Sequence, residues 1–337
     1  MHQFCFRFLP TQCFCFLIVT QLLGAEILFN QLVLKAIKEM PQGGGYATNL
    51  DAAIGLRRSN DARKGTLMVL PELAQPSYCS GATYIVFLKA IAELQKRKEI
   101  GLPQKALVQL LVKGEADGQG IWGRWNANGP GTAKLLADLK VVKNFEDITL
   151  SRPGDFMKIF WSQEIGAKER GHSVIFISKN RNSLGEWEIT YWSSNKPDGY
   201  GYKTTKAHFI KWCVFSRVTK PLGLTDIPKL PKRDDFLASM LIKDYLREDI
   251  RKKCLFSGNE FGQENLELNL QSKNFQGANI DQITEPEVRF KSYIVVKGDN
   301  LSELGERFGV SIRSIKEANG IDGSTIRIGQ LLKIPAK

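Results

Sequence analysis

The segment 293–335, near the end of this 337-residue chain, constrains the fold more than any other part of the sequence. Alternating apolar residues at its two ends are typical of short strands. Between these ends, Gly298, Gly309 and Gly320 punctuate two stretches in which apolar residues have helical spacing. The pattern predicts a small unit in which a strand, two helices and a second strand follow one another in the order βααβ.

This segment closely resembles the LysM family over its whole length. The positions that match are Tyr293, Val295, Gly298, Asp299, Leu301, Val310, Ile315, Asn319, Ile326, Gly329, Gln330, Leu332, Ile334 and Pro335. One departure is Gly305, where the family usually has alanine, and a glycine inside a helix weakens it by about 0.5–1 kcal/mol. We therefore expect residues 291–337 to form a LysM domain.

The resemblance implies that this domain binds peptidoglycan or another N-acetylglucosamine-containing glycan, such as chitin, in a shallow groove. By position, the residues that would line the groove are Gly298, Asp299, Asn300, Leu301, Gly320, Ile321 and Asp322. An alternative for Asp299 is that its side chain caps the helix that begins near Leu301.

The first 25 residues have the three parts of a secretory signal peptide. They carry one ordinary charge, Arg7, then an apolar run over residues 13–23, and then Gly24 and Ala25. A spanning helix needs about 20 apolar residues, and this run is shorter. We expect cleavage after Ala25 and a secreted, periplasmic or cell-wall-associated protein with no integral membrane span. An uncleaved leader would instead be an N-terminal membrane anchor.

Between the leader and the last segment, helical patterns precede strand patterns. The helical spacing covers residues 27–40, 84–94 and 103–112, and the strand-like runs are 174–177, 188–192 and 210–218. This order predicts an α+β domain over residues 26–220. Residues 221–290 contain several prolines, one expected helix over 234–254 and then a polar stretch, so we predict a helix and a linker there.

Cys79 is the cysteine whose neighbours suggest chemistry. Three of the six cysteines, Cys5, Cys13 and Cys15, lie in the leader, and Cys213 lies in an apolar run. Cys79 instead stands at the start of an apolar helix, where unpaired N–H groups and the helix dipole lower the pKa of a thiol. Cys79 is therefore the candidate nucleophile. The alternative is a small buried cysteine at a helix start.

His172, at the beginning of a predicted strand, is the candidate general base. His172 and His208 are the two histidines that follow the leader. They are too few for a three-histidine zinc site, and no zinc-protease spacing is present. We therefore expect neither a metal nor an organic cofactor.

A third polar group is expected to orient the imidazole of His172. A hairpin centred near Asn182 would place His172 opposite about Ser193, and alternate residues of a strand share a face. Asn195, whose side-chain carbonyl accepts a hydrogen bond, is the first choice for this group, and Ser193 is the second. The alternative is that residues 193–199 are only a turn cluster.

These features together resemble the papain-like NlpC/P60 and CHAP group of cell-wall amidases and endopeptidases. The resemblance covers residues 51–217 and rests on Tyr78-Cys79-Ser80-Gly81, Pro153-Gly154-Asp155 and Gly171-His172-Ser173-Val174. Tyr78 departs from the acidic residue that commonly precedes the nucleophile, and the third polar residue is not the family's histidine. The resemblance implies a papain-like cysteine hydrolase domain with Cys79 as nucleophile.

A glycine-rich stretch over residues 117–131 lengthens the segment between the candidate nucleophile and base. It lacks the Gly-Lys-Ser/Thr ending of a phosphate-binding loop. Aromatic faces stack on sugars and glycines permit close approach, so we predict that Trp122, Trp125 and Asn126 line a substrate groove. The alternative is that the two tryptophans are buried packing residues.

The chain carries a formal charge of +12, from 47 basic and 35 acidic residues. The basic excess is interleaved with acidic residues instead of forming a basic stripe, so we do not expect a nucleic-acid partner. We predict an exported peptidoglycan hydrolase that cleaves an amide bond in the peptide part of the cell wall by a Cys-His thiol mechanism. The LysM domain would hold it on glycan. Two alternatives are an inactive cell-wall-binding scaffold and a thiol acyltransferase.

Overall fold

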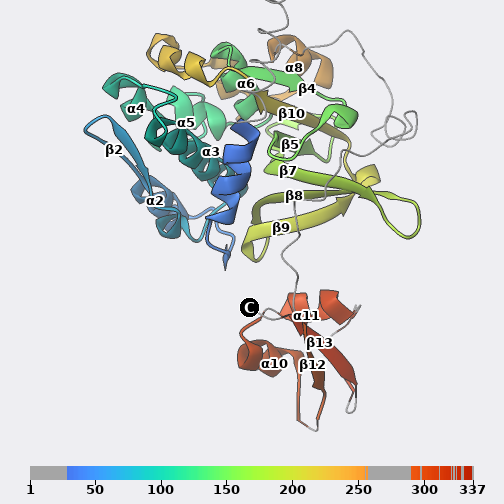
Figure 1. Cartoon of the computed structure of the whole chain (residues 1–337). Coiled ribbons are helices and arrows are strands. Elements are labelled where there is room, and N and C mark those ends of the chain that lie inside the picture. The colour runs from blue at the N-terminus through green and yellow to red at the C-terminus, as the bar shows by residue number, and fades with distance from the viewer. Residues whose placement is uncertain are drawn as a thin grey trace, which may run out of the picture. The chain divides into compact units, whose positions relative to one another are not determined.

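The computed structural model describes residues 29–254 and 256 and, apart from 297, 311, 320, 322, 324, 328 and 329, residues 290–335. These residues belong to two compact units, one on either side of residue 273 (Figure 1). The predicted leader and the polar stretch that follows residue 256 lie outside the described residues.

Helices pack together on one side of the first unit (Figure 1). They are a helix over residues 29–38, α2 (Leu50–Arg58), α3 (Cys79–Lys96), α4 (Gln104–Leu110), α5 (Gly120–Trp125) and α6 (Gly131–Asp138). A hairpin of β2 (Asn60–Arg63) and β3 (Thr66–Val69) and a 3-10 helix (Pro71–Ala74) lie between α2 and α3. The long helix α3 is apolar around most of its circumference, which is typical of a helix in the centre of a domain.

A seven-stranded antiparallel sheet packs against α3, with the strand order β1-β9-β8-β7-β5-β10-β4. The strands are β1 (Gly43–Gly44), β4 (Val142–Phe145), β5 (Phe156–Phe160), β7 (His172–Arg181), β8 (Trp187–Asn195), β9 (Gly199–Lys206) and β10 (Trp212–Val218). Two 3-10 helices lie between strands, at Ile148–Leu150 and Ala207–Phe209.

The sheet separates two apolar cores. Phe156 and Ile175 lie in the core that includes α3. Met157 and Val174, one position away on the same strands, lie in a second core on the opposite face, because successive side chains of a strand point to opposite sides. This mixture of helices and strands is compatible with the predicted α+β class. The three predicted strand runs overlap β7, β8 and β10.

Residues 221–254, where the sequence predicts the start of a helix-and-linker segment separate from the catalytic domain, instead pack onto the first unit. The elements of this segment are a 3-10 helix (Pro221–Lys229), α7 (Asp235–Ser239), β11 (Asp244–Tyr245) and α8 (Arg247–Lys253), and β11 pairs with β6 (Ile165–Gly166). The helix expected over 234–254 is therefore two short helices with a strand between them. Leu224, Met240 and Ile250 are buried in the cores of this unit, which fixes the path of the segment.

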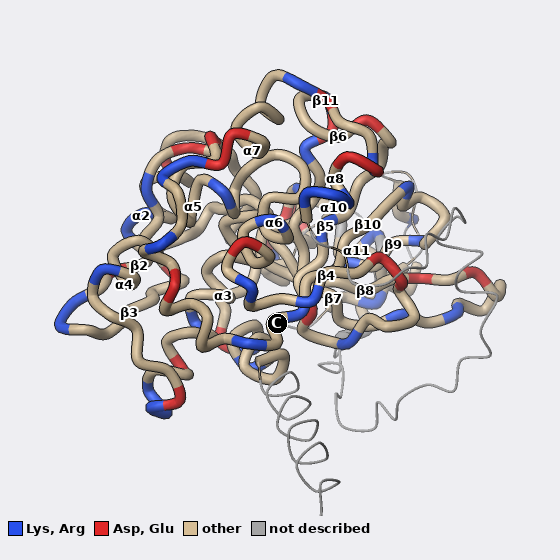
Figure 2. The backbone as a smooth tube through the Cα atoms, turned by 90° about the horizontal axis from the view of Figure 1, so that it is seen from above, with Lys and Arg blue, Asp and Glu red and all other residues tan. Residues whose placement is uncertain are grey.

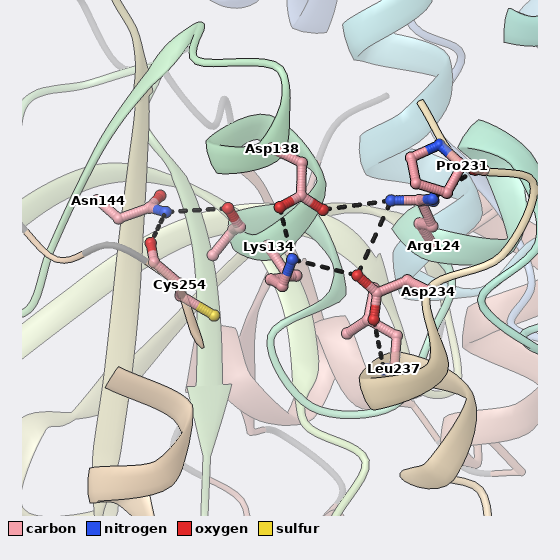
Figure 3. A network of polar contacts seen from close by, with 9 residues as sticks. Arg124, Lys134, Asp138, Asn144, Pro231, Asp234, Leu237 and Cys254 are labelled. Atoms are coloured by element: carbon pink, nitrogen blue, oxygen red, sulfur yellow. Dashed lines mark hydrogen bonds and ion pairs between the residues drawn. The ribbon is translucent and has the colours of Figure 1, made fainter. Parts of the chain in front are cut away.

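A buried network of charges ties the same segment to α5 and α6 (Figure 3). Arg124, which is 1% exposed, pairs with Asp138 at 3.2 Å and donates to the carbonyl oxygen of Pro231 at 2.6 Å. Lys134 pairs with Asp234 at 3.1 Å, and the Asp234 side chain also caps α7. Buried charges are costly unless they are paired, so removing one partner of this network would loosen the segment.

The second unit has the predicted βααβ order, with β12 (Phe290–Ile294), α10 (Leu301–Phe308), α11 (Ile312–Asn319) and β13 (Leu331–Pro335). The two strands are antiparallel, with Tyr293 opposite Leu332. Gly309 ends α10 with a φ of 64°, a conformation that favours glycine. The buried core of the unit consists of Val295, Leu301, Leu304, Ile315, Leu332 and Ile334.

Two properties of the whole described chain bear on its partners. No helix within residues 29–254 or 290–335 is long and apolar enough to cross a membrane. Lys and Arg are interspersed with Asp and Glu along the backbone (Figure 2). The distribution agrees with the interleaved charges of the sequence.

Candidate active site

Cys79 is the first residue of α3, and the loop before it is held on two sides. The Ser77 carbonyl oxygen accepts hydrogen bonds from the Ser194 hydroxyl at 2.9 Å and from the Ala47 amide at 3.0 Å. Tyr78 precedes the helix with extended backbone, and no described side chain caps the first turn. The amide groups of that turn therefore remain able to face a negative charge at or near the Cys79 sulfur.

His172 and Asn195 lie at the ends of the neighbouring strands β7 and β8. The imidazole Nε2 is 3.2 Å from Asn195 Oδ1. The Asn195 amide nitrogen donates to the carbonyl oxygens of Gly201 at 2.9 Å and Ser193 at 3.2 Å, so Oδ1 is the atom left to accept from His172. Because Nε2 donates to Asn195, Nδ1 is the ring nitrogen available for the hydrogen bond between His172 and Cys79.

Ser193, the second choice for the orienting group, has a different partner. Its side chain is fully buried, and its hydroxyl donates to the Ser173 carbonyl oxygen at 2.7 Å. This bond joins β8 to β7. The structure thus brings Cys79, His172 and Asn195 together and uses Ser193 to hold the strands.

The predicted register of this hairpin is two residues off. Ile175 pairs with Trp192, and extending this pairing by three residues places His172 opposite Asn195. The turn spans residues 182–186, and β7 contains a bulge. The net shift of two preserves the alternation of faces, so Asn195 stays on the face that the sequence predicts.

The surroundings of Cys79 favour its thiolate form. Burial by itself would raise the pKa of the thiol, but the hydrogen bond and charge of His172, the charge of Lys158 and the Ser173 amide lower the pKa to about 6. A thiol with this pKa is mostly ionised at neutral pH. The site therefore holds a thiolate at neutral pH.

Three further residues lie around the sulfur and were not expected from the sequence. Burial, together with the charge of Cys79, raises the pKa of both Tyr46 and Tyr191 to about 12. The Tyr191 ring lies edge-on to the imidazole of His172, with 5.7 Å between ring centroids. The third residue is Lys158, and its only signal in the sequence is a charge within the apolar run of β5.

The prediction that two tryptophans line an open groove is wrong. Trp125 is fully buried and stacks on Phe87 with 4.8 Å between ring centroids, and Trp122 is 2% exposed. Both lie on α5, which packs its aromatic side chains against α3. Asn126, the third predicted groove residue, is half-buried and accepts a hydrogen bond from the hydroxyl of Ser80, the residue after Cys79.

The Gly154-Asp155 turn has a structural role. Asp155 is fully buried and accepts hydrogen bonds from Arg217 at 2.8 and 2.7 Å and from Asn30 at 2.8 Å. Gly154 has a φ of 92°, and a Cβ there would lie 2.7 Å from the Asn30 carbonyl oxygen. The turn therefore fixes the helix over residues 29–38 against β5 and β10.

The other described cysteines and histidine do not form a second site. Cys213 and Cys254 are buried, and burial raises the pKa of both thiols far above its ordinary value, which makes them unreactive. His208 packs on Phe209, with 4.2 Å between ring centroids. Among the residues that the structure describes, no group of three or more His, Cys, Asp or Glu side chains is arranged to hold a metal ion.

In the second unit, the side chains predicted to line a glycan groove have mostly internal roles. Asp299 accepts hydrogen bonds from the Tyr293 hydroxyl and the Val296 amide, each at 2.8 Å. Asn300, and not Asp299, caps α10. Leu301 is 4% exposed and belongs to the core.

Of the remaining predicted groove positions, the structure describes two. Gly298 is exposed and Ile321 is half-buried. Gly298 has a φ of 101°, and the space where its Cβ would stand is open. Gly320 and Asp322 lie outside the described residues. The backbone around Gly298, more than the Asp299 side chain, is therefore the part of this turn that is open to a ligand.

Comparison with known proteins assigns the second unit. Residues 293–335 match the LysM domain family. An autolysin from Enterococcus faecalis (strain ATCC 700802 / V583) is 48% identical over 44 residues, which are 13% of this chain and 6% of the autolysin. No solved structure matches the chain. The chain therefore carries a C-terminal LysM domain, a module that binds N-acetylglucosamine-containing glycans such as peptidoglycan.

Proposed function

We propose that this protein is a cell-wall-associated cysteine amidase or endopeptidase that cleaves an amide bond in the peptide part of peptidoglycan. The observation that carries the proposal is the hydrogen-bonded series Cys79, His172 and Asn195, in which the pKa of the thiol is lowered to about 6. Cysteine, histidine and asparagine form the nucleophile, the base and the orienting group of papain-like proteases. On this basis we assign the first unit to the papain-like hydrolases of the NlpC/P60 or CHAP type.

The first half of the reaction begins from a Cys79 thiolate and a protonated His172. The sulfur attacks the amide carbonyl carbon, and the negative charge moves to the carbonyl oxygen. The backbone N–H of Cys79, at the uncapped start of α3, donates to that oxygen. His172 then gives its proton to the leaving nitrogen, the C–N bond breaks and an amine departs, leaving a thioester on Cys79.

Water completes the reaction. His172, now neutral, accepts a proton from the water that attacks the thioester carbonyl. The C–S bond breaks, the acid product leaves, and the thiolate and protonated imidazole are restored. Throughout both halves Asn195 keeps the imidazole in one orientation, because its own amide nitrogen is held by two carbonyl oxygens.

The LysM domain supports the choice of substrate. A module that binds glycan raises the concentration of the catalytic unit near the peptides attached to that glycan, without changing the chemical step. The similarity of this domain to that of an autolysin points to the same setting. We therefore place the protein outside the cell membrane, secreted or associated with the wall.

The alternatives differ in what they need from Cys79. An inactive scaffold needs no thiolate, so the lowered pKa of Cys79 favours an enzyme. A thiol acyltransferase would form the same thioester and pass it to an amine instead of water. Adding a free amine during turnover distinguishes the acyltransferase from the proposed hydrolase, because transfer gives an amide product and hydrolysis gives an acid.

The proposal is tested by Cys79→Ser and His172→Ala in the full-length protein. Both variants should lose hydrolysis of purified sacculi while still binding them, because serine lacks the thiolate population and no other described histidine bonds to Cys79. Cys213→Ser is the matched control, since its buried thiol lies in the other core, and it should stay active. Full turnover by Cys79→Ser would remove Cys79 from the mechanism.

A further inference from the structure

Lys158 is a buried lysine in the middle of β5. It is 6% exposed and stands between Met157 and Ile159, both of which lie in an apolar core. Its ammonium group donates to the Ser173 hydroxyl at 3.1 Å, and the two residues pair directly across β5 and β7. This is its one hydrogen-bond partner among the described residues. An ammonium group is costly to bury, so its position calls for a charged neighbour.

The charged and titratable groups around Lys158 come from two other segments. Cys79 at the start of α3 and Glu169 in the loop before β7 both interact with its charge. The Glu169 carboxylate is itself held by the Gly171 amide at 2.8 Å and the Trp161 amide at 3.4 Å. Burial lowers the pKa of Lys158, and the negative charges of Cys79 and Glu169 oppose that effect.

The same groups surround the sulfur. His172 on β7 and Lys158 on β5 both favour the thiolate of Cys79. The phenols that face it are Tyr46, before α2, Tyr78, at the start of α3, and Tyr191, on β8. Phenols with raised pKa values stay neutral at physiological pH. Among the described residues, Lys158 and His172 are therefore the side chains whose charge favours the thiolate, and they come from different strands.

We propose that Lys158 is a positioning residue for the nucleophile: its buried ammonium group, which donates to the Ser173 hydroxyl, supplies a positive charge beside Cys79. The inference rests on the proposed role of Cys79 and adds a second source of thiolate stabilisation. His172 gives up its proton during the proposed reaction, whereas no step of that reaction takes a proton from Lys158. The thiolate is thus partly stabilised even while His172 is neutral.

Alkylation of Cys79 by iodoacetamide measures this effect without any substrate. The rate is followed from pH 4.5 to 9 in the full-length protein, and the modified Cys79 peptide is quantified by mass spectrometry. Wild type should show a midpoint near pH 6, from the lowered pKa of Cys79. Lys158→Met should raise the midpoint by about one pH unit or more, because loss of a nearby positive charge raises the pKa of a thiol by about that amount.

Two further variants separate charge from packing. Lys158→Gln keeps a donor for the Ser173 hydroxyl but loses the charge, so its midpoint should rise as in Lys158→Met, and it replaces that variant if methionine prevents folding. Ser173→Ala removes the hydroxyl but keeps the charge, so its midpoint should stay close to wild type. Lys158→Arg should restore the low midpoint. Circular dichroism checks that each variant is folded.

The outcomes distinguish this inference from the function on which it rests. A wild-type midpoint near 6 that does not move in folded Lys158→Gln would overturn the role of Lys158 and leave Cys79 as nucleophile. A wild-type midpoint near the ordinary thiol value of about 8.5 would overturn both. A rise in Ser173→Ala equal to that in Lys158→Gln would show that packing, and not charge, controls the sulfur.

Discussion

The imidazole Nε2 of His172 lies 3.2 Å from Oδ1 of Asn195, and the amide nitrogen of Asn195 is held by the carbonyl oxygens of Ser193 and Gly201. The Asn195 amide cannot rotate without losing both of these bonds. The orientation of the imidazole is therefore determined by the strands β8 and β9, and not by a freely turning side chain.

Asn195→Ala should lower kcat on a soluble muropeptide by about 10²-fold, since an imidazole that is not oriented acts as a base only part of the time. Asn195 is 7% exposed, so its loss also leaves two carbonyl oxygens without their donor. We expect a loss of about 1–3 kcal/mol in the free energy of unfolding. Urea denaturation and steady-state kinetics measure the two effects separately.

Ser193→Ala is the control for that variant. It removes the hydrogen bond to the Ser173 carbonyl oxygen, which is worth about 1 kcal/mol, and leaves the imidazole in place. Its kcat should stay within about twofold of wild type. If Ser193→Ala were crippled while Asn195→Ala turned over normally, the assignment of the orienting residue would be reversed.

Activity should fall on the acidic side of about pH 6. The pKa of the Cys79 thiol is lowered to about 6, so the thiolate is present above that pH and is lost as the pH drops through it. The value of kcat/KM on a soluble muropeptide should decrease about tenfold for each further pH unit. An acidic limb near the ordinary thiol pKa of about 8.5 would show that the site does not activate Cys79.

Trp125 should matter to stability and not to substrate binding. Its ring is fully buried against Phe87, so Trp125→Ala should lower the free energy of unfolding by about 3–5 kcal/mol. Asn126→Ala loses a single hydrogen bond from Ser80 and should cost about 1 kcal/mol. Urea denaturation compares the two. A stable Trp125→Ala variant with a raised KM would instead support the substrate groove that the sequence predicts.

Removal of the LysM domain should separate targeting from catalysis. A chain that ends at residue 286 should keep kcat on a soluble muropeptide and lose activity on intact sacculi, because tethering raises local concentration only. Asp299→Ala in the full chain should have the same direction of effect, since Asp299 holds the Tyr293 hydroxyl and the Val296 amide. Equal losses on both substrates would mean that the domain supports the catalytic unit itself.

The sequence predicts much of this candidate site because its residues obey local rules. Cys79 begins an apolar helix, and His172 begins a strand. The alternation of a strand predicts that Asn195 shares a face with His172, and this holds although the predicted register is two residues off, since a shift of two keeps the alternation. The βααβ order of the second unit likewise follows from the spacing of glycines and apolar residues in its sequence.

Other features depend on tertiary packing, which local patterns do not contain. Trp122 and Trp125 lie in a glycine-rich stretch that resembles a loop, but α5 buries both rings against α3. Residues 221–233 contain three prolines and few apolar residues, which is typical of a linker, and only the core that buries Leu224 shows that they belong to the first unit. In the sequence, Lys158 looks like a strand residue that points to solvent. It belongs to the site only because α3, which begins at Cys79, packs over β5.

The central claim is that Cys79 cleaves a peptide amide of the cell wall, and mass spectrometry of the fragments released from purified sacculi tests it most directly. Wild type should release fragments that carry a new amine and a new carboxylate. Their summed mass should exceed that of the intact peptide by one water. The Cys79→Ala variant should release none of them. The same fragments from Cys79→Ala, or wild-type products cut only in the glycan strands, would contradict the claim.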